Sequence, residues 1–148
     1  MNLDIRKAEI DDIEYIFEIQ EKHNLGYWSI ADYHSEVSNS DSVFLVAESE
    51  DNIVGFILAR LITTFKTSEI VNFAVVEKYQ KKGIGKLLLT DLSSVLTASN
   101  YKKIELEVRE QNLQAISFYL KNKFIKDGIR KNFYQNPADN AVLMSLNF

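Results

Sequence analysis

Apolar residues recur along this chain in two rhythms that predict different secondary structure. The first is an alternation of apolar and charged residues, clearest at 104–109, Ile-Glu-Leu-Glu-Val-Arg. Alternation of period two is typical of a strand with one buried face. Alternating or continuous apolar runs bounded by turn residues occur six more times. Strands are therefore predicted at Leu3–Ala8, Val43–Ser49, Ile53–Ile62, Ser68–Val76, Ile104–Arg109, Phe124–Arg130 and Ala141–Phe148.

The second rhythm places apolar residues three or four positions apart, as on the buried face of a helix. It begins near Asp11, where Asp11-x-x-Glu14 has the spacing of a capping box, and it ends at Gly26. A shorter helix is predicted from Ser29, a third opens at Leu87, and a fourth is capped by Asn112. The residues expected to face the core are Leu87, Leu88, Leu92, Val95 and Leu96 in the third helix and Ala115, Ile116, Tyr119 and Leu120 in the fourth.

The order of these elements predicts the fold class. A strand is followed by two helices, three strands, a helix, a strand, a helix and two strands, which is typical of a layered α/β domain with a mixed sheet. The strands at 43–49 and 53–62 are joined by Glu50-Asp51-Asn52, a hairpin signal. The 148 residues contain no linker or repeat, so one domain is expected over residues 1–148.

Composition excludes some kinds of site and reveals an asymmetry of charge. The chain is 46% hydrophobic and 26% charged, as is usual for a globular protein. It has no cysteine, hence no disulfide, thiolate metal site or cysteine nucleophile. Residues 1–76 carry 5 Lys and Arg against 14 Asp and Glu (net −9), whereas residues 77–148 carry 12 against 7 (net +5). We therefore expect a polyanionic ligand at the C-terminal half and a cationic partner at the N-terminal half.

The same composition bears on localisation and on other partner classes. The N-terminal residues lack the features of a signal peptide, and no apolar run approaches the ~20 residues that span a bilayer, so no membrane partner is expected. The lack of cysteine fits the cytoplasm. A pI of about 5.2 disfavours a dedicated nucleic-acid binder. No metal-ligand spacing is present, and surface or capping roles are expected for His23 and His34.

The segment from Gln80 to Lys86, Gln-Lys-Lys-Gly-Ile-Gly-Lys, lies between a predicted strand and a predicted helix. The first N–H groups of a helix have no partner within it, and the helix dipole adds partial positive charge there. Gly83 and Gly85 lack a Cβ and allow a ligand to approach the backbone closely. Together with the three lysines of the segment they predict an anion site, for a phosphate or pyrophosphate.

Two other phosphate-binding motifs do not fit these residues. The pattern G-x-x-x-x-G-K-[ST] requires Gly where Gln80 stands and Ser or Thr where Leu87 stands, and G-x-G-x-x-G requires Gly where Leu88 stands. The remaining pattern, Q-x-x-G-x-G followed by three leucines, resembles the coenzyme A loop of the GNAT (GCN5-related N-acetyltransferase) superfamily. The alternative is a turn whose glycines serve chain geometry only and whose lysines are solvated.

A second segment narrows this resemblance. Residues 106–112 have the form L-E-V-R-x-x-N, and Tyr119 follows twelve residues after Glu107. Over nearly the whole chain the sequence is similar to the RimI-type N-terminal protein acetyltransferases. It departs from them at Lys123, where the family usually has glycine, so that Asn122 or Lys123 is expected at positive φ. It also has Phe133 in place of the first of a tyrosine pair.

The resemblance implies a GNAT fold, with a mixed, mostly antiparallel central sheet and helices on both faces, and acetyl-CoA as the cofactor. Glu107 would be the general base and Tyr119 the general acid. The cofactor-binding residues would be Phe73, Ala74 and Val75 for the pantetheine arm, Lys81, Lys82, Gly83, Ile84, Gly85 and Lys86 for the pyrophosphate, and Asn112 on the opposite side. The residues expected to line the acceptor entry are Tyr27, Trp28, Glu69 and Tyr134.

The residues fit this chemistry, with one choice open. An α-amine has a pKa of ~7.7–8.0, so a carboxylate suffices as its base. Glu105 and Glu107 share the polar face of their strand, and only the resemblance favours Glu107. Tyr119, with a reference pKa of ~10, has a proton to give. Without a cysteine for an acyl-enzyme, direct attack in a ternary complex is expected.

The leading hypothesis is an acetyl-CoA-dependent enzyme that acetylates the N-terminal α-amine of a protein, such as a basic ribosomal protein. A second hypothesis keeps the cofactor but acetylates a small-molecule amine or a lysine side chain. A third is a catalytically silent acyl-CoA-binding module, which the presence of Glu107 and Tyr119 disfavours. The acidic N-terminal half favours a cationic peptide over a neutral metabolite.

Overall fold

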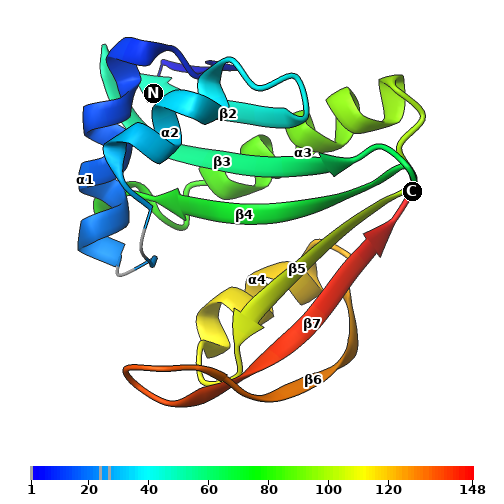
Figure 1. Ribbon diagram of the computed structural model, residues 1–148. Coiled ribbons are helices and arrows are strands. Elements are labelled where there is room, and N and C mark those ends of the chain that lie inside the picture. The colour runs from blue at the N-terminus through cyan, green and yellow to red at the C-terminus, as the bar shows by residue number, and fades with distance from the viewer. Residues whose placement is uncertain (1, 24, 27) are drawn as a thin grey trace.

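The computed structural model describes residues 2–23, 25–26 and 28–148. Within these ranges it contains a seven-stranded sheet and four α-helices (Figure 1). The strands are β1 (Leu3–Lys7), β2 (Ser42–Ser49), β3 (Asn52–Ile62), β4 (Thr67–Val75), β5 (Lys103–Arg109), β6 (Ile125–Tyr134) and β7 (Asp139–Asn147). The helices are α1 (Ile13–His23), α2 (Ile30–Val37), α3 (Ile84–Ala98) and α4 (Leu113–Lys121). The predicted order of elements is confirmed.

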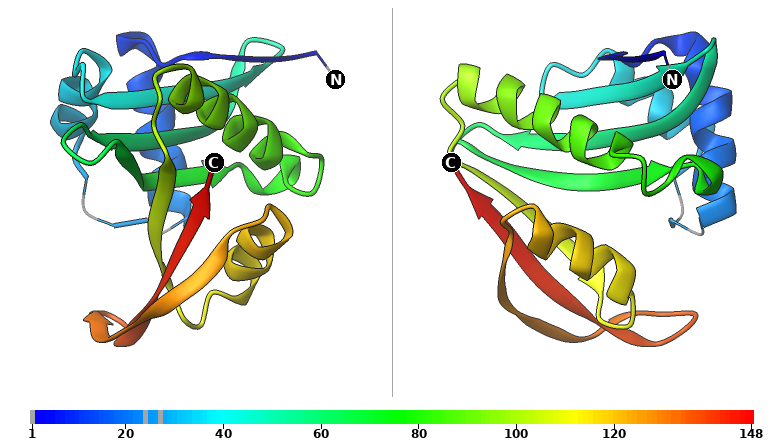
Figure 2. Two further views of the ribbon diagram at one scale, coloured as in Figure 1. Left: turned by 90° about the vertical axis from the view of Figure 1, so that its right-hand side faces the viewer. Right: turned by 180° about the vertical axis from the view of Figure 1, so that it is seen from behind.

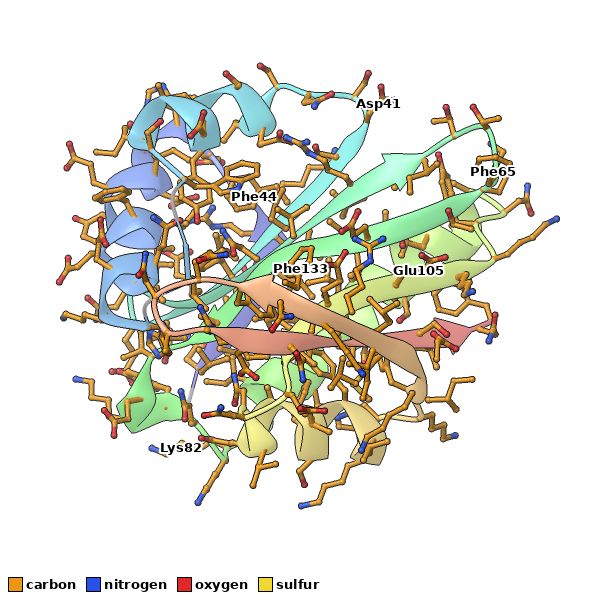
Figure 3. The ribbon with its side chains drawn as sticks, turned by 60° about the horizontal axis from the view of Figure 1, so that its bottom comes forward. Asp41, Phe44, Phe65, Lys82, Glu105 and Phe133 are labelled. Carbon is orange, nitrogen blue, oxygen red and sulfur yellow. The ribbon has the colours of Figure 1, made fainter. Side chains whose placement is uncertain are left out.

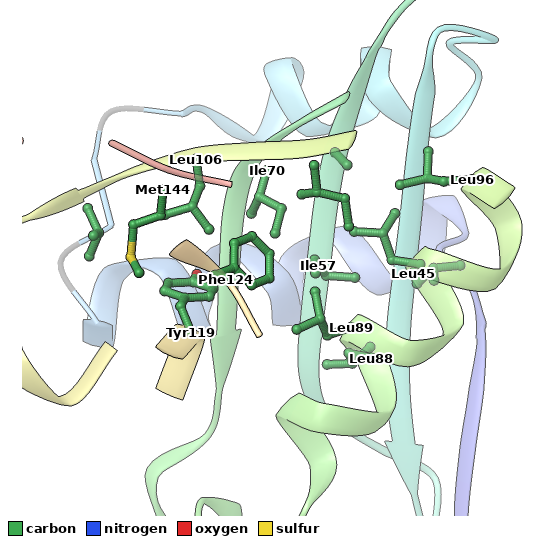
Figure 4. Packing of buried hydrophobic residues seen from close by; sticks show 14 of the residues in the cluster. Leu45, Ile57, Ile70, Leu88, Leu89, Leu96, Leu106, Tyr119, Phe124 and Met144 are labelled. Carbon is green, nitrogen blue, oxygen red and sulfur yellow. The ribbon is translucent and has the colours of Figure 1, made fainter. Parts of the chain in front are cut away.

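The sheet is mixed and mostly antiparallel, in the order β1-β2-β3-β4-β5-β7-β6. Only the β4–β5 pair is parallel among the described strands. Helices α1 and α2 lie on one face, and α3 and α4 lie on the other (Figure 2). On the α1 side, Tyr33 packs with Phe44 and Phe56. On the other side, leucines of α3 and Tyr119 of α4 share one core with the sheet (Figure 4).

The buried stripe of α3 differs from the predicted one in its phase. The helix begins at Ile84, three residues before Leu87, and its buried residues are Ile84, Leu88, Leu89, Leu92 and Leu96. Leu87 and Val95 are 45% and 43% exposed, and Leu120 of α4 is 46% exposed. Three consecutive leucines at 87–89 fit more than one helical face, so the sequence pattern did not determine which face of α3 is buried. Packing against the sheet selects the series at Leu88, Leu92 and Leu96.

The start of the first helical region also differs from its prediction. The backbone N–H of Glu9 donates to the carboxylate of Asp12 at 2.8 Å, in place of a capping box between Asp11 and Glu14. Asp12 is buried and pairs with Arg6 of β1 at 2.8 Å, so a tertiary ion pair fixes this helix start.

Other local predictions hold. The second helix begins at Ser29 as predicted, and the structure adds that the Ser29 side chain accepts from the Asp32 N–H and caps α2. Lys123 has φ +72°, which confirms positive φ in the turn after α4. In the parts of the chain that the structure describes, no helix has the length and apolar character to cross a membrane.

Candidate active site

Strands β4 and β5 pair over three residues only. Residues 67–69 of β4 pair with residues 103–105 of β5, and the two strands then diverge (Figure 1). Each strand keeps its other neighbour, β3 for β4 and β7 for β5. The facing edges of β4 beyond Glu69 and of β5 beyond Glu105 therefore have no strand between them.

A cleft of about 1240 Å³ lies at this divergence. Its walls come from the segment between α1 and α2, from β4, from β5 and the start of α4, and from the turn between β6 and β7. Its lining includes Trp28, Phe73, Glu107, Arg109, Asn112, Tyr119 and Tyr134.

The backbone of β4 presents a donor on the side away from β3. The Val76 N–H donates to the Val54 carbonyl of β3 at 2.8 Å, and successive residues of a strand point their N–H groups to opposite sides. The Val75 N–H therefore points away from β3, and the Val75 carbonyl accepts from Gln80 Nε2 at 2.8 Å. Phe73 lines the cleft, whereas the side chains of Ala74 and Val75 pack into the two cores. A cofactor role for Phe73, Ala74 and Val75 stays a prediction. In that role, the Val75 N–H would be the hydrogen-bond donor.

Glu107 lies in the cleft with one carboxylate oxygen unpaired. Its Oε1 is 3.8 Å from Arg130 Nη1, while its Oε2 is buried and has no hydrogen-bond partner among the described residues. Buried acceptors in folded proteins are normally paired, so this oxygen is available to a donor on a ligand. Glu105 does not line the cleft and instead pairs with Lys103 at 3.5 Å. The geometry thus favours Glu107 over Glu105 as the base.

Tyr119 reaches the cleft from α4 among aromatic neighbours. Its ring centroid lies 6.3 Å from that of Phe73 and 5.2 Å from that of Phe124. Burial raises the pKa of Tyr119, so the hydroxyl stays protonated at neutral pH. No hydrogen bond joins this hydroxyl to another of the described residues, which leaves its proton free for a ligand.

The turn before α3 has the backbone geometry that its glycines predicted. Lys81 has φ +62° and Gly83 has φ +85°, and Gly83 is the N-cap of the 15-residue helix. The N–H groups of Ile84, Gly85 and Lys86 belong to the first helical turn, where no carbonyl of the helix can accept from them. Lys82 extends outward beside the turn (Figure 3). Residues 81–86 therefore form one turn with donors and positive charge, as an anion site requires.

Comparison with known proteins identifies the family. Residues 8–124 match the family model described as acetyltransferase (GNAT) family. The chain belongs to the GNAT acetyltransferases. The ribosomal protein bS18-alanine N-acetyltransferase of Haemophilus influenzae is 33% identical over 95% of this chain and 96% of its own length. The N-alpha-acetyltransferase of Saccharolobus solfataricus is 31% identical over 95% of this chain and 90% of its own.

A solved structure shares the fold of this GNAT acetyltransferase. Arabidopsis thaliana NAA60 in complex with acetyl-CoA superposes with a TM-score of 0.89, over 99% of this chain and 100% of that chain. The two sequences are 18% identical, so the likeness shows the fold alone. The α/β fold class that the sequence predicted is thereby confirmed.

Asn112 belongs to the wall of the cleft opposite β4. Its side-chain oxygen accepts from the Ala115 N–H at 3.1 Å and caps α4, as predicted. The cap uses the oxygen of the amide, so the Nδ2 group remains to donate elsewhere. A role of Asn112 toward the cofactor stays a prediction.

Two of the four residues expected at the acceptor entry line the cleft. Trp28 precedes α2, and its ring packs on Tyr33 at 5.2 Å. Tyr134 ends β6. Glu69 is not a lining residue, since it sits where β4 last pairs with β5. Tyr27 lies outside the described residues.

Two arginines of the cleft have contacts that the sequence did not predict. Arg60 donates to the buried Glu36 at 2.6 Å, and its guanidinium lies 5.3 Å from the Trp28 ring. Arg109 donates to two carbonyl groups of the turn between β6 and β7. His23 lines the cleft while its Nδ1 lies 2.9 Å from the Ile19 carbonyl, so the expected capping contact is present. Of the two arginines, only Arg109 stands beside a candidate base in the sequence, two residues after Glu107.

Replacing Glu69 by Gln is expected to stabilise the protein at neutral pH. Burial raises the pKa of Glu69, and the charges of Glu107 and Glu105 raise it further. The folded state therefore holds this proton more tightly than the unfolded chain, so wild-type stability falls as the pH rises through the carboxyl pKa. The uncharged variant avoids that loss.

Denaturant unfolding at pH 7 and at about pH 4, near the ordinary glutamate pKa, checks this expectation. The gain of Glu69→Gln over wild type is expected to be larger at pH 7 and to shrink toward acidic pH. A variant less stable than wild type at pH 7 contradicts it.

Proposed function

We propose that this protein transfers the acetyl group of acetyl-CoA to the N-terminal α-amine of a protein, by direct attack of the amine on the thioester. The proposal is carried by the presence of Glu107 and Tyr119 in one cleft, one with an unpartnered buried oxygen and the other with a free hydroxyl. Relatives named for the ribosomal protein bS18 alanine and for N-alpha acetylation support the acceptor class. The acetyl-CoA complex of a protein with the same fold supports the cofactor.

Glu107 acts as the base for the acceptor amine. An α-amine with a pKa of ~7.7–8.0 is partly neutral near pH 7, and the neutral amine attacks the thioester carbon, so that its nitrogen becomes positively charged. The Oε2 of Glu107 has no partner in the described part of the protein and takes one proton from this nitrogen, directly or through one water. The nitrogen is then left as a neutral amide, and after turnover Glu107 loses the proton to solvent while Tyr119 takes one up.

Val75 and Tyr119 act on the negative charge that develops on the carbonyl oxygen and on the leaving sulfur. The Val75 N–H, directed away from β3, stabilises the oxyanion on the former carbonyl oxygen. When the carbon–sulfur bond breaks, Tyr119 gives its proton to the leaving sulfur. The rings of Phe73 and Phe124 pack around Tyr119, so its proton is shielded from bulk water.

A basic peptide fits the acceptor side of the cleft. Residues 1–76 carry a net charge of −9, and Asp32 lines the cleft at the start of α2, whereas the charge of Glu36 is paired with Arg60. Such a surface raises the association rate of a cationic peptide more than its affinity. The proposed acceptor is an N-terminus that begins with Ala, Ser or Thr and continues with basic residues, as in a ribosomal protein.

Three substrates test the acceptor class. They are a basic peptide with a free N-terminal alanine, the same peptide with its α-amine blocked and one lysine free, and spermidine. We expect the highest kcat/KM for the free α-amine. Faster acetylation of the blocked peptide or of spermidine contradicts the proposal and favours a lysine or small-amine acetyltransferase. Binding of acetyl-CoA with no transfer to any of the three would indicate a silent binding module.

A further inference from the structure

The turn between β6 and β7 is held by a single side chain of β5. Arg109 Nη1 donates to the Pro137 carbonyl at 2.8 Å, and Arg109 Nη2 donates to the Gln135 carbonyl at 3.1 Å. The same guanidinium lies 4.4 Å from the centroid of the Tyr134 ring. The planar guanidinium of arginine can make two hydrogen bonds and a stacking contact at the same time. The ammonium of lysine lacks this geometry.

This turn forms one wall of the cleft. Residues 133–137 all line it, opposite the segment that precedes α2. The turn extends past the end of β5 (Figure 1), and β5 itself pairs with β7 along residues 103–109. Arg109 therefore ties the tip of the hairpin to the strand that carries Glu107, two residues away.

The other polar contacts of this hairpin lie just after the turn, at the first two residues of β7. Asn140 Nδ2 donates to Glu110 Oε1 at 3.1 Å, and Asp139 Oδ2 accepts from the Gln111 N–H at 3.2 Å. Both residues belong to β7. Within the described part of the chain, residues 135–138 make no side-chain hydrogen bond other than those to Arg109. The contacts of Asp139 and Asn140 anchor the start of β7, and Arg109 is the side chain that holds residues 135–137 themselves.

We propose that Arg109 is a positioning residue that sets the affinity for the acceptor by holding the β6–β7 turn and Tyr134 in place. The inference rests on the proposed function, in which the acceptor enters between this turn and the segment before α2. Its effect falls on the acceptor because the predicted cofactor contacts lie on β4 and on the turn before α3, with the exception of Asn112, whose side chain is held by its own cap on the Ala115 N–H. The contacts of Arg109 described above do not reach those elements.

Two substitutions separate the geometry of the guanidinium from its charge. Arg109→Met removes the donors and the charge, and Arg109→Lys keeps the charge and preserves a flexible apolar stem. We expect both to raise the KM for the acceptor about tenfold or more, the scale of one lost hydrogen bond from a charged donor. We expect kcat and the Kd for acetyl-CoA to change little. Lys126→Met removes an exposed cation from the same hairpin away from the turn, and it should behave as wild type.

Hydrogen–deuterium exchange in the absence of any acceptor tests the structural step by itself. Faster exchange at residues 133–138 is expected in both Arg109 variants and not in Lys126→Met. This readout remains valid if peptides prove not to be the acceptor, and KM is then measured with the amine that is accepted. Wild-type KM or wild-type exchange in Arg109→Lys overturns the proposal, and so does a fall in kcat at unchanged KM.

Discussion

Replacing Tyr119 by Phe is expected to lower the turnover number ~10²-fold or more, the usual scale for the loss of an acid–base group. The substitution removes the hydroxyl and keeps the ring that packs against Phe73 and Phe124. Burial raises the pKa of Tyr119, so the wild-type hydroxyl carries a proton throughout the neutral pH range. Steady-state kinetics gives kcat, and calorimetry should show nearly unchanged affinity for acetyl-CoA.

Tyr101→Phe is the matched control for this substitution. Tyr101 is also buried, in the same core, but it precedes β5 at the end where β4 and β5 still pair and does not line the cleft. Its variant should turn over like wild type. If Tyr119→Phe keeps the wild-type turnover number, Tyr119 has a packing role only, and the leaving sulfur takes its proton from another donor.

The parts of the fold that the sequence predicted are those set by local interactions. Alternation at 104–109 depends on which face of one strand is buried, and the caps at Ser29 and Asn112 depend on residues three positions away. The glycine turn was likewise predictable, because Gly83 permits a backbone conformation that most residues avoid. Each of these signals lies within a few residues of the structure that it predicts.

The features that the sequence did not predict depend on distant partners. The face of α3 that is buried is chosen by the sheet, and consecutive leucines at 87–89 gave no preference. The first helical region starts where Asp12 meets Arg6, and Arg109 bonds to carbonyl groups 26 and 28 residues away. The choice between Glu105 and Glu107 followed only when the divergence of β4 and β5 placed one of them in the cleft.

Replacing Gly83 by Val is expected to abolish measurable binding of acetyl-CoA. With φ at +85°, a β-branched residue adopts this backbone only with strain, ~1–2 kcal/mol for a left-handed residue. A Cβ at position 83 meets no protein atom within 4 Å, so the side chain has room within the fold. We expect this side chain to occupy the open space beside the N-cap of α3 and to keep an anion from the free N–H groups of the first turn.

Two further variants show whether Gly83→Val loses binding because its side chain keeps the ligand away or because its backbone is strained. A Cβ at Gly128 of β6 would also meet no protein atom within 4 Å, and Gly128 has no positive φ, so Gly128→Val should bind acetyl-CoA as wild type does. Gly83→Asn places a side chain at the same point as Gly83→Val, with a residue that tolerates positive φ. Calorimetric titration of folded Gly83→Val and Gly83→Asn should show no binding in either. Wild-type affinity in Gly83→Val would mean that the turn before α3 is not the phosphate site, and recovery in Gly83→Asn would assign the loss to backbone strain.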